Sequence, residues 1–339
     1  MEKKDTGYAT HLTQSELPVF FLQLGANTSL FFGHVLKQAA LSHGLNNVYV
    51  LTDTNFDDYS KYNCIDVSGY INGVKEFDKV YQHHSINPYF FEKACFDRWF
   101  IINDIVKELG ISYFVHADCD VLILQNLIPV FQKFIKGKYD GTMMFFELGE
   151  NSVTSGHTSF WSAKLINDFC EFVLAKYANR PAFDKMLKDT LAGKFLDNKN
   201  VSDMILLDVF RTEIKPNTLN LLSLETEGIS FDFNANVPFN GCTYYFECTP
   251  DTRIKKMTKR KDGLYGKVAG VQGAPIYSKF YTLHFQGYLT KTLIPLHTSA
   301  QSAAEGLSYY LSAKSHNLVR RAKLYKNKVR DRVRKLIKK

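Results

Sequence analysis

The sequence lacks the features that define several large classes of protein. Its 339 residues contain no apolar run of about 18 residues, which excludes a membrane-spanning helix. The six cysteines are scattered and fit neither a disulfide framework nor a CxxC zinc pattern. Residues 1–5 carry charges instead of opening an apolar segment, so we expect no secretory signal. Together these absences predict a reduced, cytoplasmic protein.

The net charge of +8 is distributed unevenly. Residues Arg320 to Lys339 contain eleven Lys or Arg and one Asp, a charge of +10, so the rest of the chain carries −2. A nearly neutral body argues against binding along a nucleic-acid backbone. Apolar residues recur in the tail at three- and four-residue steps: Ala322, Tyr325, Val329, Val333 and Leu336. This pattern predicts a basic amphipathic helix on an anionic membrane, peripheral on its inner face, with a solvated terminal helix as the alternative.

Buried strands and helices alternate in the first half of the chain. Continuous apolar runs predict strands at residues 18–24, 48–51 and 111–117, and helical spacing predicts helices at 30–41 and 90–109. This alternation is typical of an α/β fold with a mostly parallel sheet flanked by helices. Ligands of such sheets bind beyond the carboxyl ends of the strands. The polar or glycine residues at those ends are Gln23, Gly25, Thr52, Asp53, Asp118 and Asp120.

The second half has a different composition. Residues 145–161 read as strands around a polar turn, and 165–177 as an amphipathic helix. Residues 229–283 are rich in Phe, Tyr and Gly with little helical periodicity. We therefore expect them to add strands and loops to the first sheet.

Asp118-Cys119-Asp120 is the most informative motif. The two carboxylates follow a buried strand and precede the apolar run Val121 to Leu124. Carboxylates separated by one residue can converge on one cation, and hard oxygen ligands favour Mg²⁺ or Mn²⁺. The alternative is an exposed turn, although burying two carboxylates without a counter-ion is unfavourable.

A second segment, His284 to Gly287, is followed by Lys291. An imidazole there can complete the metal's coordination, and the lysine can bind a diphosphate.

Together these residues resemble the metal-dependent glycosyltransferases of the GT-A fold, and specifically glycosyltransferase family 8. The segment from Asp118 to Leu127 is similar to the family's DxD segment with its trailing apolar residues. His284 and Gly287 match its later His-x-x-Gly-x-x-Lys motif, whose histidine is a metal ligand in the family; Lys291 falls one residue later than the family's lysine.

The resemblance extends to further positions. Arg98 lies where the family places a basic residue against the donor sugar or phosphate, with Lys93 as a weaker candidate. Asp203 lies at a similar helix start and could accept sugar hydroxyls or stabilise positive charge at the anomeric carbon. Gly156 is the one residue of Thr154-Ser155-Gly156-His157 that agrees with the family's Asn-Ala-Gly. The family's N-terminal Asp is absent, and Gln23, Gly25 and Asn27 follow the first strand instead.

The resemblance implies a hexosyltransferase that uses Mn²⁺ or Mg²⁺. The enzyme would move a sugar from a nucleotide-diphosphate donor, with UDP expected, to a hydroxyl of a glycan or lipid-linked glycan. The resemblance favours retention of configuration at the anomeric carbon. We divide the chain accordingly into an N-terminal segment (1–17), a catalytic domain (18–294) and a basic tail (295–339). Within the catalytic domain we expect a nucleotide-sugar part at about 18–215 and an acceptor part at about 216–294.

Three alternatives remain. Phosphohydrolases of the haloacid-dehalogenase type also carry DxD after a strand, but Leu122 stands where they usually have Thr or Val. They also need an acidic pair downstream of the DxD, whereas the pair Asp57-Asp58 lies upstream of it. A nucleotidyltransferase would need a basic glycine-rich loop after the first strand, and Leu24 to Asn27 contains no basic residue. A non-enzymatic adaptor would use the tail alone on a membrane surface.

Overall fold

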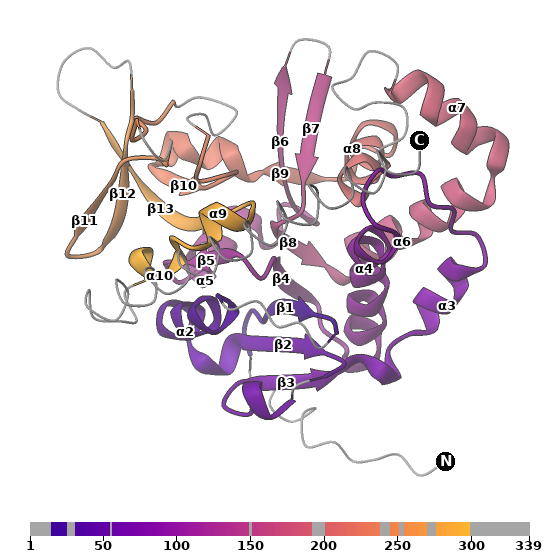
Figure 1. Ribbon diagram of the computed structural model, residues 1–339, viewed down its shortest axis with the longest axis horizontal. Coiled ribbons are helices and arrows are strands. Elements are labelled where there is room, and N and C mark those ends of the chain that lie inside the picture. The colour runs from indigo at the N-terminus through magenta and orange to yellow at the C-terminus, as the bar shows by residue number, and fades with distance from the viewer. Residues whose placement is uncertain are drawn as a thin grey trace, which may run out of the picture.

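The computed structural model describes residues 15–25, 31–54, 56–148, 151–191, 201–237, 245–250, 254–269 and 276–298. Within these ranges the chain forms two sheets with helices packed around them (Figure 1). The predicted basic tail at 320–339 lies outside the described residues.

The larger sheet has eight strands in the order β3-β2-β1-β4-β8-β6-β7, with β9 paired to β6. Parallel pairing joins β3, β2, β1 and β4, and it also joins β6 to β9. The pairs β4–β8, β8–β6 and β6–β7 are antiparallel. The expected α/β fold with a mostly parallel sheet is therefore confirmed. The strands are β1 (Val19–Gln23), β2 (Val48–Thr52), β3 (Asn63–Asp66), β4 (Tyr113–Ala117), β6 (Gly141–Leu148), β7 (Asn151–Ser155), β8 (Thr158–Ser162) and β9 (Thr218–Asn220).

The apolar runs of the central strands reflect burial on both faces of this sheet. In β1, Val19 and Phe21 belong to one core cluster while Phe20, between them, belongs to the other. Helix α2 packs in the first cluster; α4, α6 and α8 pack in the second. The helices are α2 (Phe32–His43), α3 (Asn72–Asp78), α4 (Tyr89–Leu109), α6 (Ala163–Ala178), α7 (Arg180–Leu191) and α8 (Asp203–Glu213), with short α5 (Ile128–Val130), α9 (Tyr288–Lys291) and α10 (Ile294–His297).

Local chemistry explains where the longer helices start and stop. Gly110 follows α4 with φ of 64°, a left-handed conformation that favours glycine, and its N–H bonds the carbonyl of Val106. The Ser162 side chain caps α6 by accepting from the N–H of Leu165. Gly110 thus ends α4 where the sequence predicted, and Ser162 explains why α6 begins at Ala163, two residues before its predicted start.

The later strands form a separate sheet, so the expectation that residues 229–283 extend the first sheet was wrong. The second sheet has the order β10-β13-β12-β11, and β5 pairs with β13. β5 directly follows Asp120 and belongs to the second sheet, where it pairs antiparallel with β13. The strands are β5 (Val121–Ile123), β10 (Ile229–Phe231), β11 (Met257–Arg260), β12 (Gly263–Lys267) and β13 (Tyr277–His284).

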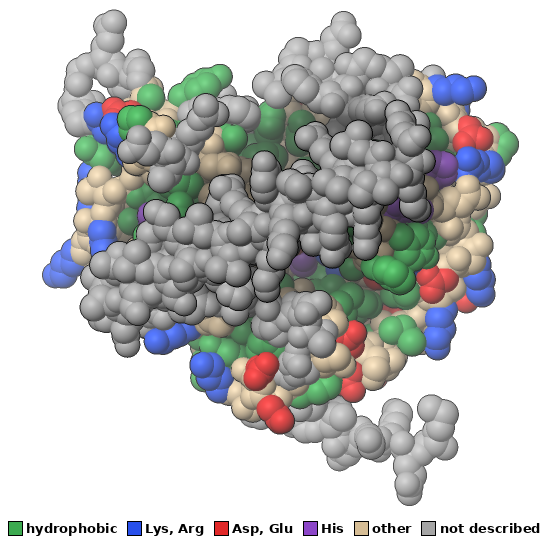
Figure 2. Space-filling view, in the orientation of Figure 1, with side chains coloured by type: hydrophobic (Ala, Val, Ile, Leu, Met, Phe, Trp, Pro, Cys, Tyr) green, Lys and Arg blue, Asp and Glu red, His purple; other side chains and the backbone are tan. Residues whose placement is uncertain are grey.

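Strand β11 is the edge of the second sheet, and it is strongly charged. Lys259, Arg260 and Lys261 are exposed at its end. Figure 2 shows Lys and Arg side chains along the side of the molecule that β11 and β12 occupy in Figure 1. Charged side chains on an edge strand oppose pairing with another sheet, which gives this basic surface a structural explanation.

Candidate metal and sugar-nucleotide site

The Asp118-Cys119-Asp120 motif forms the junction between the two sheets. Asp118 follows β4 of the larger sheet, and Asp120 precedes β5 of the smaller one. A tight turn joins them, in which the N–H of Val121 donates to the carbonyl of Asp118 (3.0 Å). The Cys119 thiol points the other way and donates to the carbonyl of Leu22 (3.1 Å). Burial raises the pKa of this thiol, so it stays protonated beside the two carboxylates.

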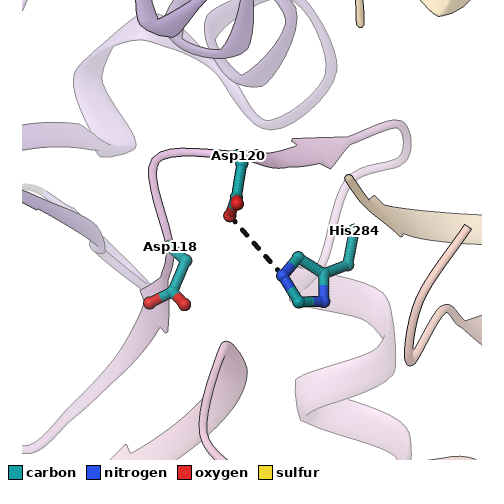
Figure 3. A group of neighbouring side chains, drawn as sticks. All are labelled: Asp118, Asp120 and His284. Carbon is teal, nitrogen blue, oxygen red and sulfur yellow. Dashed lines mark ion pairs between the residues drawn. The ribbon is translucent and has the colours of Figure 1, made fainter. Parts of the chain in front are cut away.

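Strand β13 brings His284 to this turn. His284 pairs with Val121 in the ladder between β13 and β5, and the N–H of Phe285 donates to the carbonyl of Asp120 (3.0 Å). One ligand atom each from Asp118, Asp120 and His284 lies within 4.8 Å of the others (Figure 3). The sequence prediction of these residues as one group therefore agrees with the geometry.

The His284 ring is oriented for metal binding. Its Nδ1 donates to the carbonyl of Phe233 (2.8 Å), because a carbonyl can only accept, and this leaves the Nε2 lone pair toward Asp120. Nε2 lies 3.6 Å from Oδ1 of Asp120, which is too far for a hydrogen bond (Figure 3). Two carboxylates and one correctly oriented imidazole form a donor set that fits Mn²⁺ or Mg²⁺.

Arg98 connects this group to a third carboxylate. From α4 it donates through Nη1 to Oδ1 of Asp118 (2.6 Å) and through Nη2 to Asp203. Burial opposes ionisation of Asp118, but the Arg98 guanidinium and the neighbouring histidines together outweigh it and lower the pKa of Asp118 to about 2. Asp203 begins α8, is almost fully buried, and also accepts from Trp99 Nε1 (3.0 Å). Both predicted catalytic residues thus lie beside the metal-ligand group.

The residues of the C-terminal motif also reach the site. Lys291 Nζ lies 2.9 Å from Oδ2 of Asp120, even though the lysine stands one position later than in the resembling family. Gly287 precedes α9 with φ of 85°, a conformation that favours glycine, and α9 carries Lys291. A short helix thus places a cationic group beside a candidate metal ligand.

These residues line one cavity of about 840 Å³, which is large enough for a small ligand. Elements of both sheets and of α4 and α8 form its wall. Its polar and charged lining includes Arg98, Asp118, Asp120, Asp203, Asp208, His284 and Lys291.

The four residues predicted at the carboxyl ends of β1 and β2 (Gln23, Gly25, Thr52 and Asp53) lie at the same sheet edge but are not among the residues that line this cavity. Gln23 ends β1 opposite Thr52 of β2. Thr52 is buried and donates to the carbonyl of Thr54 (2.8 Å), and Asp53 accepts from the N–H of Gly25 (2.7 Å). Their predicted contact with the donor remains a prediction.

Sequence reasoning gave no role to several residues that support the site. His157 stacks on His284 with ring centroids 4.0 Å apart. Asp232, buried after β10, accepts from the N–H of His284 (3.0 Å) and pairs with the buried Lys255. Asp208 lies in the cavity wall, where it accepts from the hydroxyls of Ser152 (2.6 Å) and Thr154 (2.7 Å). Among these residues, only His157 had a signal in the sequence, its position after Gly156.

Lys93, the weaker basic candidate, pairs with Asp97 and Asp78 and is not among the cavity-lining residues.

Two buried histidines next to the metal-ligand group, His116 and His157, favour the neutral form at pH 7. Burial and the nearby Arg98 together lower the pKa of His116 to about 4. Burial and the neighbouring His284 hold the pKa of His157 well below its usual range. Neutral rings can donate from one nitrogen and accept at the other, as His157 does between Asp232 and Ser155.

Comparisons with known proteins find weak structural likeness. No protein-family model and no curated protein matches the sequence. Mouse xyloside xylosyltransferase 1 in its apo form has a TM-score of 0.42 at 10% identity, covering 60% of this chain and 84% of that one. The glycosyltransferase GlyE of Streptococcus pneumoniae has 0.35 at 12% identity, covering 63% and 47%. A cytidylyltransferase of Leptospira borgpetersenii has 0.28 at 12% identity, covering 59% and 96%. Similarity at this level assigns neither family 8 nor an activity.

None of the described helices combines the length and the apolar character needed to cross a membrane.

Proposed function

We propose that this chain is a metal-dependent glycosyltransferase that moves a hexose from a UDP-sugar to a hydroxyl group, with retention of configuration. The observation that carries the proposal is the convergence of Asp118, Asp120 and His284 at the wall of a cavity that also holds Arg98 and Lys291. Carboxylate, imidazole and cationic groups in one pocket are the combination that a metal-bound diphosphate requires.

Each of these side chains has a task in the proposed reaction. Asp118, Asp120 and His284 would hold Mn²⁺ or Mg²⁺. A divalent ion bound there supplies positive charge against the negative charge that develops on the leaving diphosphate. Lys291, close to Asp120, would bind a diphosphate oxygen as a point charge. Arg98 keeps Asp118 ionised and fixes Asp203 in the cavity wall.

Asp203 is the residue we assign to the sugar. Trp99 and Arg98 hold its Oδ2, and Oδ1 accepts the N–H of Met204 (2.9 Å), so the carboxylate is fixed in place. A fixed negative charge in the cavity can stabilise positive charge at the anomeric carbon without reorganising during the reaction. Proton NMR of the first product formed would show an α linkage from an α-linked donor if the configuration is retained.

The acceptor we propose is a glycan or lipid-linked glycan at an anionic membrane on the cytoplasmic side. The support for this part is the sequence of the tail, whose basic and apolar residues alternate at helical spacing. The anchor and the catalytic site would then lie in separate parts of the chain.

Titration calorimetry with UDP and Mn²⁺ tests the proposed site. UDP should bind in the presence of Mn²⁺ and lose that affinity in EDTA, because an ion held by Asp118, Asp120 and His284 would supply positive charge for the diphosphate. Asp120→Asn should show the same loss while keeping the wild-type melting temperature. Equal UDP affinity with and without metal would contradict the proposed site.

A further inference from the structure

A buried ion pair lies directly behind His284, outside the cavity lining. Lys255 Nζ pairs with Asp232, and the solvent exposure of both side chains is 0%. Removing two charges from water is unfavourable, and apolar residues of similar volume often stabilise a fold as well or better. Stability alone is therefore a weak explanation for this pair, and its contacts point to another role.

The contacts of the pair converge on His284. Oδ2 of Asp232 accepts from the backbone N–H of His284 (3.0 Å). Lys255 Nζ also donates to the carbonyl of Asn234 (3.1 Å). Phe233 lies between these two fixed residues, and its carbonyl accepts from Nδ1 of His284 (2.8 Å). The pair thus holds both the main chain of His284 and the carbonyl that orients its ring.

The same segment holds the ring that packs against His284. The backbone carbonyl of Asp232 accepts from Nε2 of His157 (3.0 Å), and the His157 ring stacks on His284 with an interplanar angle of 17°. A shift of residues 232–234 would therefore move the partner of each imidazole. Both the ring orientation of His284 and its tautomer depend on this segment.

We propose that Asp232 and Lys255 are positioning residues that keep Nε2 of His284 directed at the metal held by Asp118 and Asp120. This rests on the metal site of the proposed function. Partners that orient a ligand from behind usually change metal affinity by about 10–100-fold when they are replaced. The pair would set metal affinity without touching metal or substrate.

The test uses the full chain and Mn²⁺ alone, titrated by electron paramagnetic resonance. In Asp232→Leu/Lys255→Met both charges leave together, so no unpaired charge stays buried. We expect its Mn²⁺ dissociation constant to rise about 10–100-fold. Electron spin echo spectra should lose the coupling of Mn²⁺ to an imidazole nitrogen. A matched control, Lys176→Met/Glu213→Leu, removes the ion pair between α6 and α8 and should leave both readouts unchanged.

A second variant, Asp232→Asn/Lys255→Met, keeps an oxygen that can accept from the N–H of His284. Its Mn²⁺ affinity should fall between those of the wild type and the Leu/Met variant. Wild-type affinity and nitrogen coupling in both variants would overturn the positioning role. If the Leu/Met variant does not fold, the same result in the Asn/Met variant alone would overturn it. If Asp120→Asn binds Mn²⁺ as tightly as the wild type does, the metal site itself is overturned. This outcome distinguishes failure of the metal site from failure of the positioning role.

Discussion

At the residue scale, the site combines a carboxylate that stays charged with histidines that stay neutral. Arg98 pairs with Asp118 and so favours its ionised form, while the same guanidinium disfavours a charge on His116. Nδ1 of His116 donates to the carbonyl of Gly156 (2.9 Å), so Nδ1 carries the proton of the neutral ring. The charge pattern of the site is thus set by burial, by Arg98 and by the histidines around Asp118.

His116 should make the metal-free protein less stable in mild acid. Its pKa is about 4 in the folded protein and about 6.5 in the unfolded chain, so the unfolded chain binds the proton more readily. Stability is therefore complete above pH 6.5 and falls as the pH is lowered toward 4. Between pH 6.5 and 5 we expect a loss of about 2 kcal/mol. Urea unfolding in EDTA measures this; His116→Gln should show a shallower pH dependence, and an unchanged one would contradict the assignment.

Gly156 should not tolerate a side chain. A Cβ there would lie 2.9 Å from two ring atoms of Trp99 and 3.1 Å from Leu207, within the core behind the site. We expect Gly156→Ala to lower the free energy of unfolding by about 1–3 kcal/mol, as overpacking usually does. Gly33→Ala is the matched control because its Cβ meets no atom within 4 Å, and in helix α2 it should be neutral or slightly stabilising. Urea unfolding curves that show equal stability for both variants would contradict this packing.

At the element scale, α4 and α8 meet at the pair of Arg98 and Asp203, and the pair should matter more for turnover than for nucleotide binding. Arg98→Lys keeps the charge but cannot reach both Asp118 and Asp203 with one planar group. We expect kcat to fall about tenfold or more while UDP affinity changes about threefold or less. Arg211→Lys, which alters a similar pair with Asp208 but is not among the cavity-lining residues, is the control. Parallel losses in kcat and UDP affinity would make Arg98 an ordinary binding residue.

Individual elements differ in how far the sequence predicts them. β1, β2 and β4 were predictable because both faces of each are buried, which leaves continuous apolar runs. The pairing of β13 was not predictable, because the short apolar run of β5 does not show which strand it pairs with and lies far from β13 in sequence. This pairing explains why residues 229–283 were wrongly placed in the first sheet.

The site shows the same division. Asp118 and Asp120 are recognisable from their spacing after a strand, and His284 from its resemblance to a known motif. Asp232 and Lys255 carry no such signal, since an isolated Asp or Lys in sequence usually indicates an exposed position. Only the folded second sheet, in which β13 pairs with β5, shows that both are buried near His284.

At the scale of the whole molecule, the tail should act as a membrane anchor that the catalytic domain does not need. Removing residues 320–339 deletes a charge of +10 and leaves a body of −2, and each basic residue near an anionic bilayer contributes up to about 1 kcal/mol. The truncated protein should stop sedimenting with anionic liposomes at low salt while keeping its hydrolysis of nucleotide sugar. Neutral liposomes and high salt are the controls. Continued sedimentation of the truncated protein would show that the anchor lies elsewhere.

The central claim is that Asp118, Asp120 and His284 bind the metal for glycosyl transfer, and slow transfer to water tests it most directly. Wild-type protein with Mn²⁺ would be incubated with a panel of UDP-sugars, and free sugar, UDP and inorganic phosphate would be measured. We predict equal amounts of free sugar and UDP from at least one donor, and no such release in EDTA or with Asp120→Asn. Release of inorganic phosphate alone, or sugar release that is unchanged by EDTA and by Asp120→Asn, would contradict the account.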